Sequence, residues 1–199
     1  MTSPDLDRAL AQLRRRRVVA AATESFFGLL ADATSVEAVD RLLELKPRGA
    51  EKGIPLLLPS LEVWRGLVTE LPDLARRLAA EFWPGPLTIA LPASSAVDPR
   101  ALLDGRVAVR LPSRSPAAQV ASLFGRPVTA TSANPPGAAP ARTDAEVVRA
   151  FPPNDALWIW PGRAPGGEPS TVVVVAGERW EVVRAGAILP ARIEAVART

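Results

Sequence analysis

Val18-Val19-Ala20-Ala21-Ala22-Thr23-Glu24-Ser25 reads as an apolar strand, residues 18–22, that ends in a polar turn. The hydroxyls and the carboxylate leave the strand together, as a site for a small polar substrate requires. Open α/β sheets place their ligands at such strand ends. The alternative is a capped helix start, which fits the pattern equally well.

Before this strand, the chain predicts a helix. Ser3 is a candidate N-cap, Pro4 suits the first helical position, and Asp5 and Asp7 favour the positive end of the helix. The run Arg14–Arg17 closes it. Four arginines can bind nucleic acid, but cations at a helix C-terminus are the ordinary case, and we favour that structural interpretation.

After the strand, helices and strands alternate. The spacing Thr34-Ser35-Val36-Glu37 predicts a capping box and a helix, and Thr143-Asp144-Ala145-Glu146 predicts a second one. Further helices are expected at 60–68, 72–82, from Ser115-Pro116 onwards, and at the C-terminus. Strands are expected at 54–58, 87–91, 107–111, 127–130, 157–160, 171–176 and 180–184.

This alternation predicts an α/β fold. The last strands are consecutive, so part of the sheet should be antiparallel and the whole sheet mixed. No internal repeat or clean boundary divides the chain, and residues 1–199 are expected to form a single domain. The Pro- and Gly-rich stretch Pro161–Pro169 is either a passive linker, which the sequence favours, or a mobile lid over a site.

Composition excludes several kinds of chemistry. The 199 residues contain no cysteine, histidine or tyrosine, which removes disulfides, thiolate nucleophiles, imidazole bases and the usual zinc sites. No metal site built from protein side chains is expected. Positioning and electrostatic stabilisation therefore suit this protein better than covalent catalysis. A polar N-terminus and the lack of a membrane-length apolar run predict a cytoplasmic protein without a membrane span.

Lysine is rare among the 24 basic residues, and the two lysines lie six residues apart in Lys46-Pro47-Arg48-Gly49-Ala50-Glu51-Lys52-Gly53. A loop of three cations broken by Pro and Gly can surround a triphosphate from several directions. It lacks the GxxxxGK[ST] pattern of a P-loop. A solvated basic loop explains the residues equally well.

Two further segments stand out. Phe82-Trp83-Pro84-Gly85-Pro86-Leu87-Thr88 fixes an unusual backbone path, and a rigid turn with a packed tryptophan is the leading interpretation. Thr129-Ala130-Thr131-Ser132-Ala133-Asn134 places hydroxyls and an amide at a strand end. Such groups bind phosphate or ribose, although they are also common in turns.

The order and spacing of these segments resemble the YrdC/TsaC family over about residues 15–190. The family's PTETxYGL segment corresponds to residues 22–29, its KxRP loop to 46–49, and its WPGPLT turn to 83–88. Its VAVRxP strand is intact at 107–112 and its TSAN segment at 131–134. The late PST(V/I) motif corresponds to 169–172, followed by an arginine-containing strand that ends at Arg184. The longer members' extra C-terminal domain is expected to be missing.

The resemblance implies a twisted mixed sheet with helices around a deep basic cavity. It also implies that L-threonine, bicarbonate and ATP are joined into threonylcarbamoyl-AMP with release of pyrophosphate, a nucleotidyltransferase reaction that uses Mg²⁺ with ATP. Partner proteins then transfer the threonylcarbamoyl group to a tRNA adenosine, so contact with RNA is possible.

The site residues that the resemblance implies fall into two groups. Lys46 and Arg48 would be catalytic. The ATP-binding group comprises Lys46, Arg48, Lys52, Thr131, Ser132, Asn134 and Arg184. The threonine-binding group comprises Ser25, Arg110 and Ser170, with Arg110 pairing with the substrate carboxylate.

The chain departs from the family pattern at Ala22, Ser25, Phe27 and Gly49, where the family has Pro, Thr, Tyr and Pro. Serine keeps the hydroxyl and phenylalanine keeps the packing. One alternative function is a paralogous, YciO-like enzyme that handles a carbamoyl- or acyl-adenylate. The other is a non-catalytic RNA-binding protein, for which phosphate contacts alone would suffice.

Overall fold

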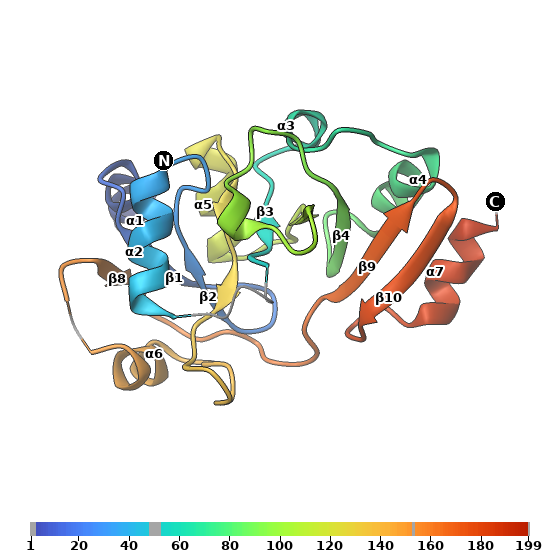
Figure 1. Ribbon diagram of the computed structural model, residues 1–199. Coiled ribbons are helices and arrows are strands. Elements are labelled where there is room, and N and C mark those ends of the chain that lie inside the picture. The colour runs from blue at the N-terminus through green and yellow to red at the C-terminus, as the bar shows by residue number, and fades with distance from the viewer. Residues whose placement is uncertain (1–2, 48–52, 153, 199) are drawn as a thin grey trace.

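The computed structural model describes residues 3–47, 53–152 and 154–198 of the chain (Figure 1). Its α-helices are α1 (Pro4–Arg14), α2 (Val36–Leu45), α3 (Leu61–Leu67), α4 (Asp73–Phe82), α5 (Pro116–Phe124), α6 (Asp144–Ala150) and α7 (Pro190–Ala197). Its strands are β1 (Val18–Ala22), β2 (Phe27–Leu30), β3 (Leu56–Leu57), β4 (Leu87–Pro92), β5 (Arg106–Arg110), β6 (Val128–Thr129), β7 (Thr131–Ser132), β8 (Leu157–Ile159), β9 (Thr171–Ala176) and β10 (Arg179–Arg184).

The strand that opens the sequence argument, β1, lies inside a four-stranded sheet of order β7-β2-β1-β8. It pairs antiparallel with β2 and parallel with β8. All five of its residues are buried because both faces are covered. Val19 and Ala21 pack in a cluster with α1 and α5, whereas Val18, Ala20 and Ala22 face the larger core. A strand that is covered on both faces reads as a continuous apolar run.

The other sheet has six strands in the order β10-β9-β4-β5-β3-β6. The β4–β9 and β3–β5 pairs are parallel, and the β4–β5, β3–β6 and β9–β10 pairs are antiparallel. The predicted mixed α/β fold is therefore confirmed, including the antiparallel pairing of the last two strands.

One residue, Ala130, separates β6 of the large sheet from β7 of the small one. Thr129 secures this junction with its fully buried hydroxyl. The hydroxyl accepts a hydrogen bond from the Ala31 amide at 2.8 Å and donates one to the Leu29 carbonyl at 3.1 Å. The two sheets are thus held together where the chain crosses between them.

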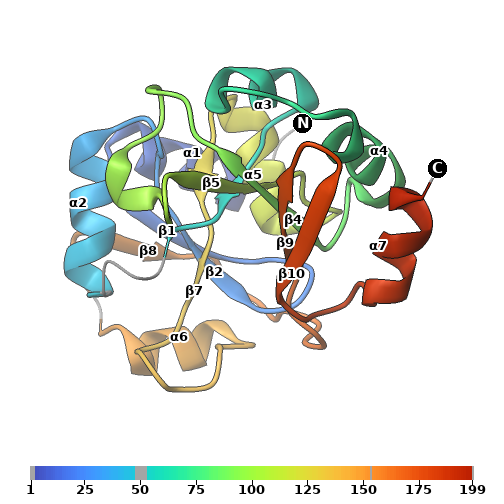
Figure 2. The same cartoon turned by 45° about the vertical axis from the view of Figure 1, so that its right-hand side comes forward.

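The helices cover the sheets at opposite ends of the molecule. Helices α1 and α5 contact each other and β1, and α2 also lies against β1. Helices α4 and α7 pack together beside β4, β9 and β10, as the two views in Figures 1 and 2 show. Within the described ranges, no helix combines the length and the apolarity that a membrane crossing requires.

The predicted capping boxes have different outcomes. Thr143 and Glu146 form the predicted box at the start of α6, because the Thr143 hydroxyl accepts from the Glu146 amide and the Glu146 carboxylate accepts in return. The prediction of a capping box that begins at Thr34 is wrong. Ser35 caps α2 instead, since Asp32 takes the Thr34 hydroxyl and amide as donors at 2.6 and 2.9 Å.

Other sequence predictions needed correction. Residues 27–30 form strand β2, which was not expected after the polar turn. The strand expected at 54–58 is limited to Leu56–Leu57, and the one expected at 127–130 becomes β6 followed by β7. Pairing with neighbouring strands, which a local pattern does not contain, decides these boundaries.

The arginine run after α1 takes part in contacts within the chain, but Arg14, Arg15 and Arg16 are exposed, so its structural role stays a prediction. The Arg41 guanidinium of α2 donates to the Arg15 and Arg16 carbonyls at 2.9 and 2.8 Å. Arg17 donates to the Gln12 side chain at 3.3 Å. These contacts occupy the end of α1 with side chains and backbone of the same chain.

Candidate active site

A cavity of about 760 Å³ lies between the two sheets. Apolar side chains of β4, β5, β9 and β10 form one part of its lining: Ala90, Ala108, Val172, Val174 and Val183. Hydroxyl and charged residues form the other part: Thr23, Ser25, Thr131, Ser132, Ser170, Asp104, Arg106, Arg110 and Arg184. Three arginines against one aspartate give these charged lining residues an excess of positive charge.

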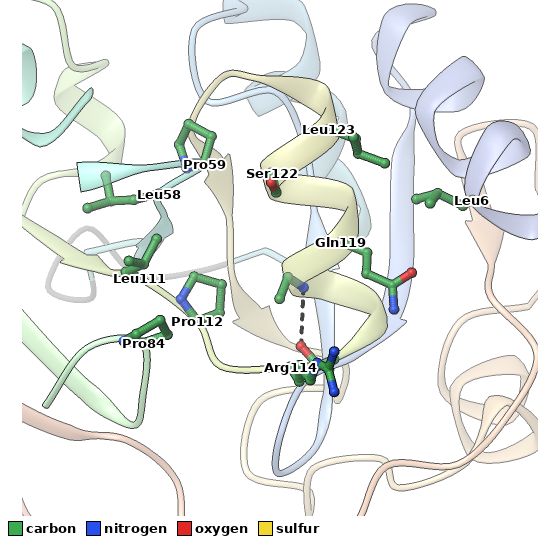
Figure 3. Close-up of a pocket in the computed structure, with 12 residues that line it drawn as sticks. Leu6, Leu58, Pro59, Pro84, Leu111, Pro112, Arg114, Gln119, Ser122 and Leu123 are labelled. Carbon is green, nitrogen blue, oxygen red and sulfur yellow. Dashed lines mark hydrogen bonds between the residues drawn. The ribbon is translucent and has the colours of Figure 1, made fainter. Parts of the chain in front are cut away.

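A smaller depression of about 400 Å³ lies elsewhere on the surface, between α5, Leu6 of α1 and the prolines Pro59, Pro84 and Pro112 (Figure 3). Arg114 is its one charged lining residue. None of the predicted site residues lines it. The cavity between the sheets is therefore the candidate active site.

The turn after β1 enters this cavity in a fixed conformation. The Thr23 hydroxyl donates to the Phe26 carbonyl at 2.8 Å and accepts from the Ser25 and Phe26 amides at 3.2 and 3.3 Å. These bonds close the turn on itself, as Thr side chains do in many loops. Because the turn is closed in this way, Ser25 is presented to the cavity.

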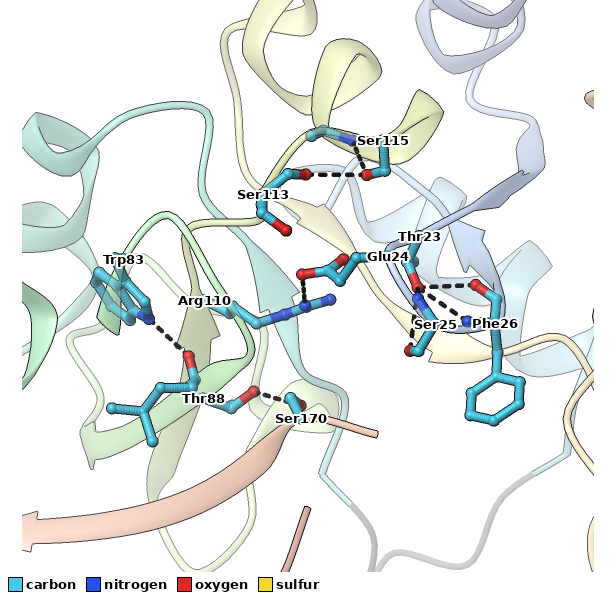
Figure 4. A network of polar contacts seen from close by, with 12 residues as sticks. Thr23, Glu24, Ser25, Phe26, Trp83, Thr88, Arg110, Ser113, Ser115 and Ser170 are labelled. Carbon is cyan, nitrogen blue, oxygen red and sulfur yellow. Dashed lines mark hydrogen bonds and ion pairs between the residues drawn. The ribbon is translucent and has the colours of Figure 1, made fainter. Parts of the chain in front are cut away.

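Arg110 and Glu24 form an ion pair beside this turn (Figure 4). Arg110 is the last residue of β5, and its side chain is 9% exposed; that of Glu24 is 17% exposed. The Arg110 Nη1 group donates to Glu24 Oε1. Burial lowers the pKa of the Arg110 guanidinium, while the Glu24 carboxylate opposes that effect.

Ser170 and Arg184 form a second polar group on the far side of the cavity. The Ser170 hydroxyl shares a 2.9 Å hydrogen bond with Thr88 Oγ1, and Arg184 Nη2 donates to it at 2.8 Å. A β-bulge at the end of β10 pairs Arg184 with Val172 of β9. A β-bulge changes the direction in which the side chains of its strand point. Arg184 and Arg110 both line the cavity, and desolvation, followed by the positive charge of Arg110, lowers the pKa of Arg184.

Lys46 joins the third polar group. It caps the end of α2, is 7% exposed, and points to β7 and the segment that follows it. Its ammonium donates to the Ser132 carbonyl, to Ser132 Oγ at 3.2 Å and to Asn134 Oδ1 at 3.1 Å. The structure therefore brings together Lys46, Ser132 and Asn134 from segments 86 and 88 residues apart. Thr131, which precedes them on β7, lines the cavity.

Two predicted residues of the phosphate group, Arg48 and Lys52, lie outside the described residues. Among the other predicted residues, one contact joins the two predicted groups. Arg184, expected on the ATP side, contacts Ser170, expected on the threonine side. The Lys46 group lies at the β7 side of the cavity.

Sequence reasoning included the Glu24 carboxylate in the polar turn but gave it no partner or role, and it did not assign Thr88 to the site. Glu24 lies between two residues of the polar turn and has the charge to pair with a site arginine. Thr88 is 1% exposed within the otherwise apolar strand β4. A hydroxyl in such a run needs a hydrogen-bond partner, which was the available signal.

The 83–88 turn is structural, as the sequence favoured. Trp83 is buried, packs on Trp64 with ring centroids 4.6 Å apart, and donates from Nε1 to the Leu87 carbonyl at 2.6 Å. A Cβ at Gly85 would lie 2.3 Å from the Phe82 carbonyl oxygen, so only glycine fits. The turn fixes the start of β4 and with it Thr88.

The segment Pro161–Pro169 connects β8 of the small sheet to β9 of the large one. The Gly166 amide donates to the Ser25 carbonyl at 2.7 Å, and Arg142 donates to the Pro165 carbonyl at 2.8 Å. Gly166 has φ +84°, and a Cβ there would lie 2.6 Å from the Arg142 guanidinium carbon. The segment is therefore a linker that is hydrogen-bonded to the turn after β1. Movement of this segment as a lid stays a prediction.

Comparison with known proteins agrees with this geometry. The sequence profile of the Sua5/YciO/YrdC family, described as "Telomere recombination", matches residues 11–186. The chain belongs to the Sua5/YciO/YrdC family. The resemblance that the motifs indicated is thereby confirmed.

Two curated relatives in the Sua5/YciO/YrdC family are named threonylcarbamoyl-AMP synthase. The protein from Halorhodospira halophila is 40% identical over 168 residues, or 83% of this chain and 86% of that protein. The protein from Pyrococcus abyssi is 41% identical over 124 residues, or 61% of this chain and 36% of that protein. The matched segment thus covers about a third of the P. abyssi protein's length.

A solved member of the family has a closely similar fold. The crystal structure of P. abyssi Sua5 complexed with L-threonine has a TM-score of 0.89 and 32% identity, covering 98% of this chain and 58% of that one.

Proposed function

We propose that this protein is an L-threonylcarbamoyladenylate synthase, which forms threonylcarbamoyl-AMP and pyrophosphate from L-threonine, bicarbonate and ATP. The observation that carries the proposal is one cavity that unites the Arg110 and Arg184 guanidinium groups with the hydroxyls of the family motifs. Its relatives in the family bear the synthase name, and the threonine complex of P. abyssi Sua5 supports the amino-acid substrate.

The nucleotide half of the proposed site comprises Lys46, Thr131, Ser132 and Asn134, with Arg48 and Lys52 from the same loop. The ammonium of Lys46 already contacts Ser132 and Asn134. During adenylation, negative charge develops on phosphate oxygens. A cation that is already held in place can stabilise this charge, because the cation does not have to reorganise first. Lys46 and Arg48 therefore have the catalytic role in the proposal.

The threonine half comprises Ser25, Arg110 and Ser170. A guanidinium group recognises a carboxylate through parallel N–H donors, which suits Arg110 to the substrate's carboxylate. The Ser25 and Ser170 hydroxyls can hold polar groups of the amino acid. Arg184 contacts Ser170 directly, so we place it between the two halves, where it can also meet phosphate.

Magnesium is proposed to enter with ATP. In the described part of the chain, no group of three or more acidic, histidine or cysteine side chains has metal-binding geometry. Mg²⁺ in nucleotide sites is typically held by phosphate oxygens and water with one or two carboxylates. The cavity lining, with the carboxylate of Asp104, fits that arrangement. The ion would neutralise phosphate charge beside the arginines.

The reaction places the protein in tRNA modification, in the cytoplasm. Partner proteins would take up threonylcarbamoyl-AMP and transfer its acyl group, and contact with RNA belongs to the same proposal. We also propose that the chain works as one domain, because the cavity takes residues from both sheets.

The decisive test is pyrophosphate release by the purified protein with ATP, Mg²⁺, bicarbonate and threonine. We expect release only when threonine is present, and loss of activity in Lys46→Ala and Arg48→Ala. Arg65→Ala removes an exposed cation outside the cavity and is the matched control. Release without threonine would instead support the paralogous enzyme, and salt-sensitive RNA binding without any release would support the RNA-binding alternative.

A further inference from the structure

Arg110 depends on one side chain for its position. Among the described residues, Glu24 is the sole hydrogen-bond acceptor for its guanidinium, and only Nη1 makes that bond. The other guanidinium nitrogens make no hydrogen bond to a described residue. Because Arg110 lines the cavity, these nitrogens remain available to a ligand.

Glu24 lies between Arg110 and the turn after β1. It does not line the cavity, although its neighbours Thr23 and Ser25 do. Its second carboxylate oxygen, Oε2, is buried without a hydrogen-bond partner in the described structure. Figure 4 shows the carboxylate beside the Arg110 guanidinium, with the Thr23–Phe26 turn beyond it.

A buried carboxylate oxygen without a partner costs stability, and burial of the guanidinium adds a desolvation cost of its own. The pair is retained although neither ion satisfies all of its hydrogen-bonding capacity. Arg184 adds to the cost, because it brings a second positive charge to the same cavity. Without Glu24, Arg110 would face that like charge with no counter-ion and would turn away.

We propose that Glu24 is a positioning residue for threonine binding, which holds the Arg110 guanidinium with its free N–H groups directed at the substrate carboxylate. Glu24 itself does not touch threonine. The carboxylate takes one edge of the guanidinium and leaves the other for the ligand. This inference rests on the proposed function, since it assigns a role within the same threonine site.

The physical consequence concerns threonine far more than ATP. A guanidinium that is free to rotate loses the parallel alignment that makes carboxylate recognition strong. Glu24→Ala should therefore raise the KM and the dissociation constant for threonine by about 10- to 100-fold, the range for a lost charged hydrogen bond. The KM for ATP should stay within about twofold.

The Glu24→Gln variant distinguishes the effect of the acceptor's position from the effect of its negative charge. Glutamine keeps an oxygen acceptor for Nη1 at nearly the same size, but a neutral acceptor is about half as strong as a charged one. We expect threonine affinity between those of the wild type and Glu24→Ala. Because glutamine also preserves the packing, this variant keeps the proposal testable where the alanine variant fails to fold.

A double-mutant cycle with Arg110→Ala distinguishes an indirect role from direct contact. If Glu24 acts through Arg110, then adding Glu24→Ala to Arg110→Ala leaves threonine affinity unchanged within about twofold. Additive losses would overturn the proposal and assign Glu24 a direct contact, for example with the substrate's ammonium group. A fall in kcat alone, with an unchanged threonine KM, would overturn it in favour of a purely structural role.

Threonine binding should be measured by calorimetry as well as by pyrophosphate release. Glu178→Ala is the matched control, because Glu178 pairs with Arg77 at 2.8 Å on the surface and does not line the cavity. Wild-type protein that does not bind threonine would refute the proposed function itself. Wild-type protein that binds threonine no better than Glu24→Ala and Glu24→Gln would refute this inference alone.

Discussion

The junction between the sheets gives a sharp prediction about stability. Thr129→Val replaces a fully buried hydroxyl by a methyl group of the same shape. The Ala31 amide then loses its acceptor at 2.8 Å, and the Leu29 carbonyl loses a donor at 3.1 Å. Because valine fills the same volume, no cavity is created and the change isolates the two hydrogen bonds.

The size of the effect follows from these two bonds. A buried N–H left without an acceptor costs about 1–3 kcal/mol, and a lost neutral hydrogen bond costs about 1 kcal/mol. The free energy of unfolding should therefore fall by about 2–4 kcal/mol. At about 2–4 °C per kcal/mol for a chain of this size, the Tm should fall by about 5–15 °C.

Calorimetry and urea unfolding measure this directly. Thr129→Ser is the matched control, because it keeps the hydroxyl and loses only a buried methyl group, at about 1 kcal/mol. Thr129→Val should be clearly less stable than Thr129→Ser. A Thr129→Val protein within about 0.5 kcal/mol of the wild type would refute the reasoning, since the Ala31 amide would then not depend on this hydroxyl.

Three further predictions concern the site and a helix cap. Lys46→Met keeps the length of the side chain without its charge, and kcat/KM for ATP should fall by about 100-fold or more; ATP titration within threefold of wild type would contradict the phosphate role. Arg184→Ala should raise the KM of both ATP and threonine by about tenfold, because it also releases Ser170, whereas Ser170→Ala should affect threonine alone; equal effects of the two variants on ATP would count against this division. Glu146→Gln should lower the Tm at pH 7, because backbone hydrogen bonds from Arg142 and Thr143 lower the pKa of Glu146; this stability is present above the unfolded pKa and lost as pH falls through the folded pKa, so the Tm difference should close in acid. A Tm difference that persists unchanged in acid would show that the carboxylate charge is not its source.

The sequence predicted the elements whose causes are local. The capping box at Thr143 formed because its partners lie three residues apart on one turn of helix. The box at Thr34 did not form, because Asp32, two residues earlier, competes for the same hydroxyl. Strand β2 was missed because its place depends on pairing with β1 and β7.

The candidate site likewise combines residues that the sequence motifs identify with contacts that only the fold creates. The motifs identified Ser25, Arg110 and Ser132, which all line the cavity. The resemblance put Lys46 and Asn134 in one ATP-binding group, but no local spacing encodes their contact, since 88 residues separate the two and only the fold joins them. The Glu24–Arg110 pair is likewise a contact between β1's turn and the end of β5, which no local spacing encodes.

A single residue separates β6 from β7, and this restricts where the chain can accept insertions. Side chains on a strand alternate between faces, so one residue added at Ala130 would turn Thr131 and Ser132 to the opposite sides of β7. Such an insertion would remove Ser132 from Lys46 while leaving every side chain present. We therefore expect changes of length to be tolerated in the exposed part of 161–169, but not at the Ala130 crossing.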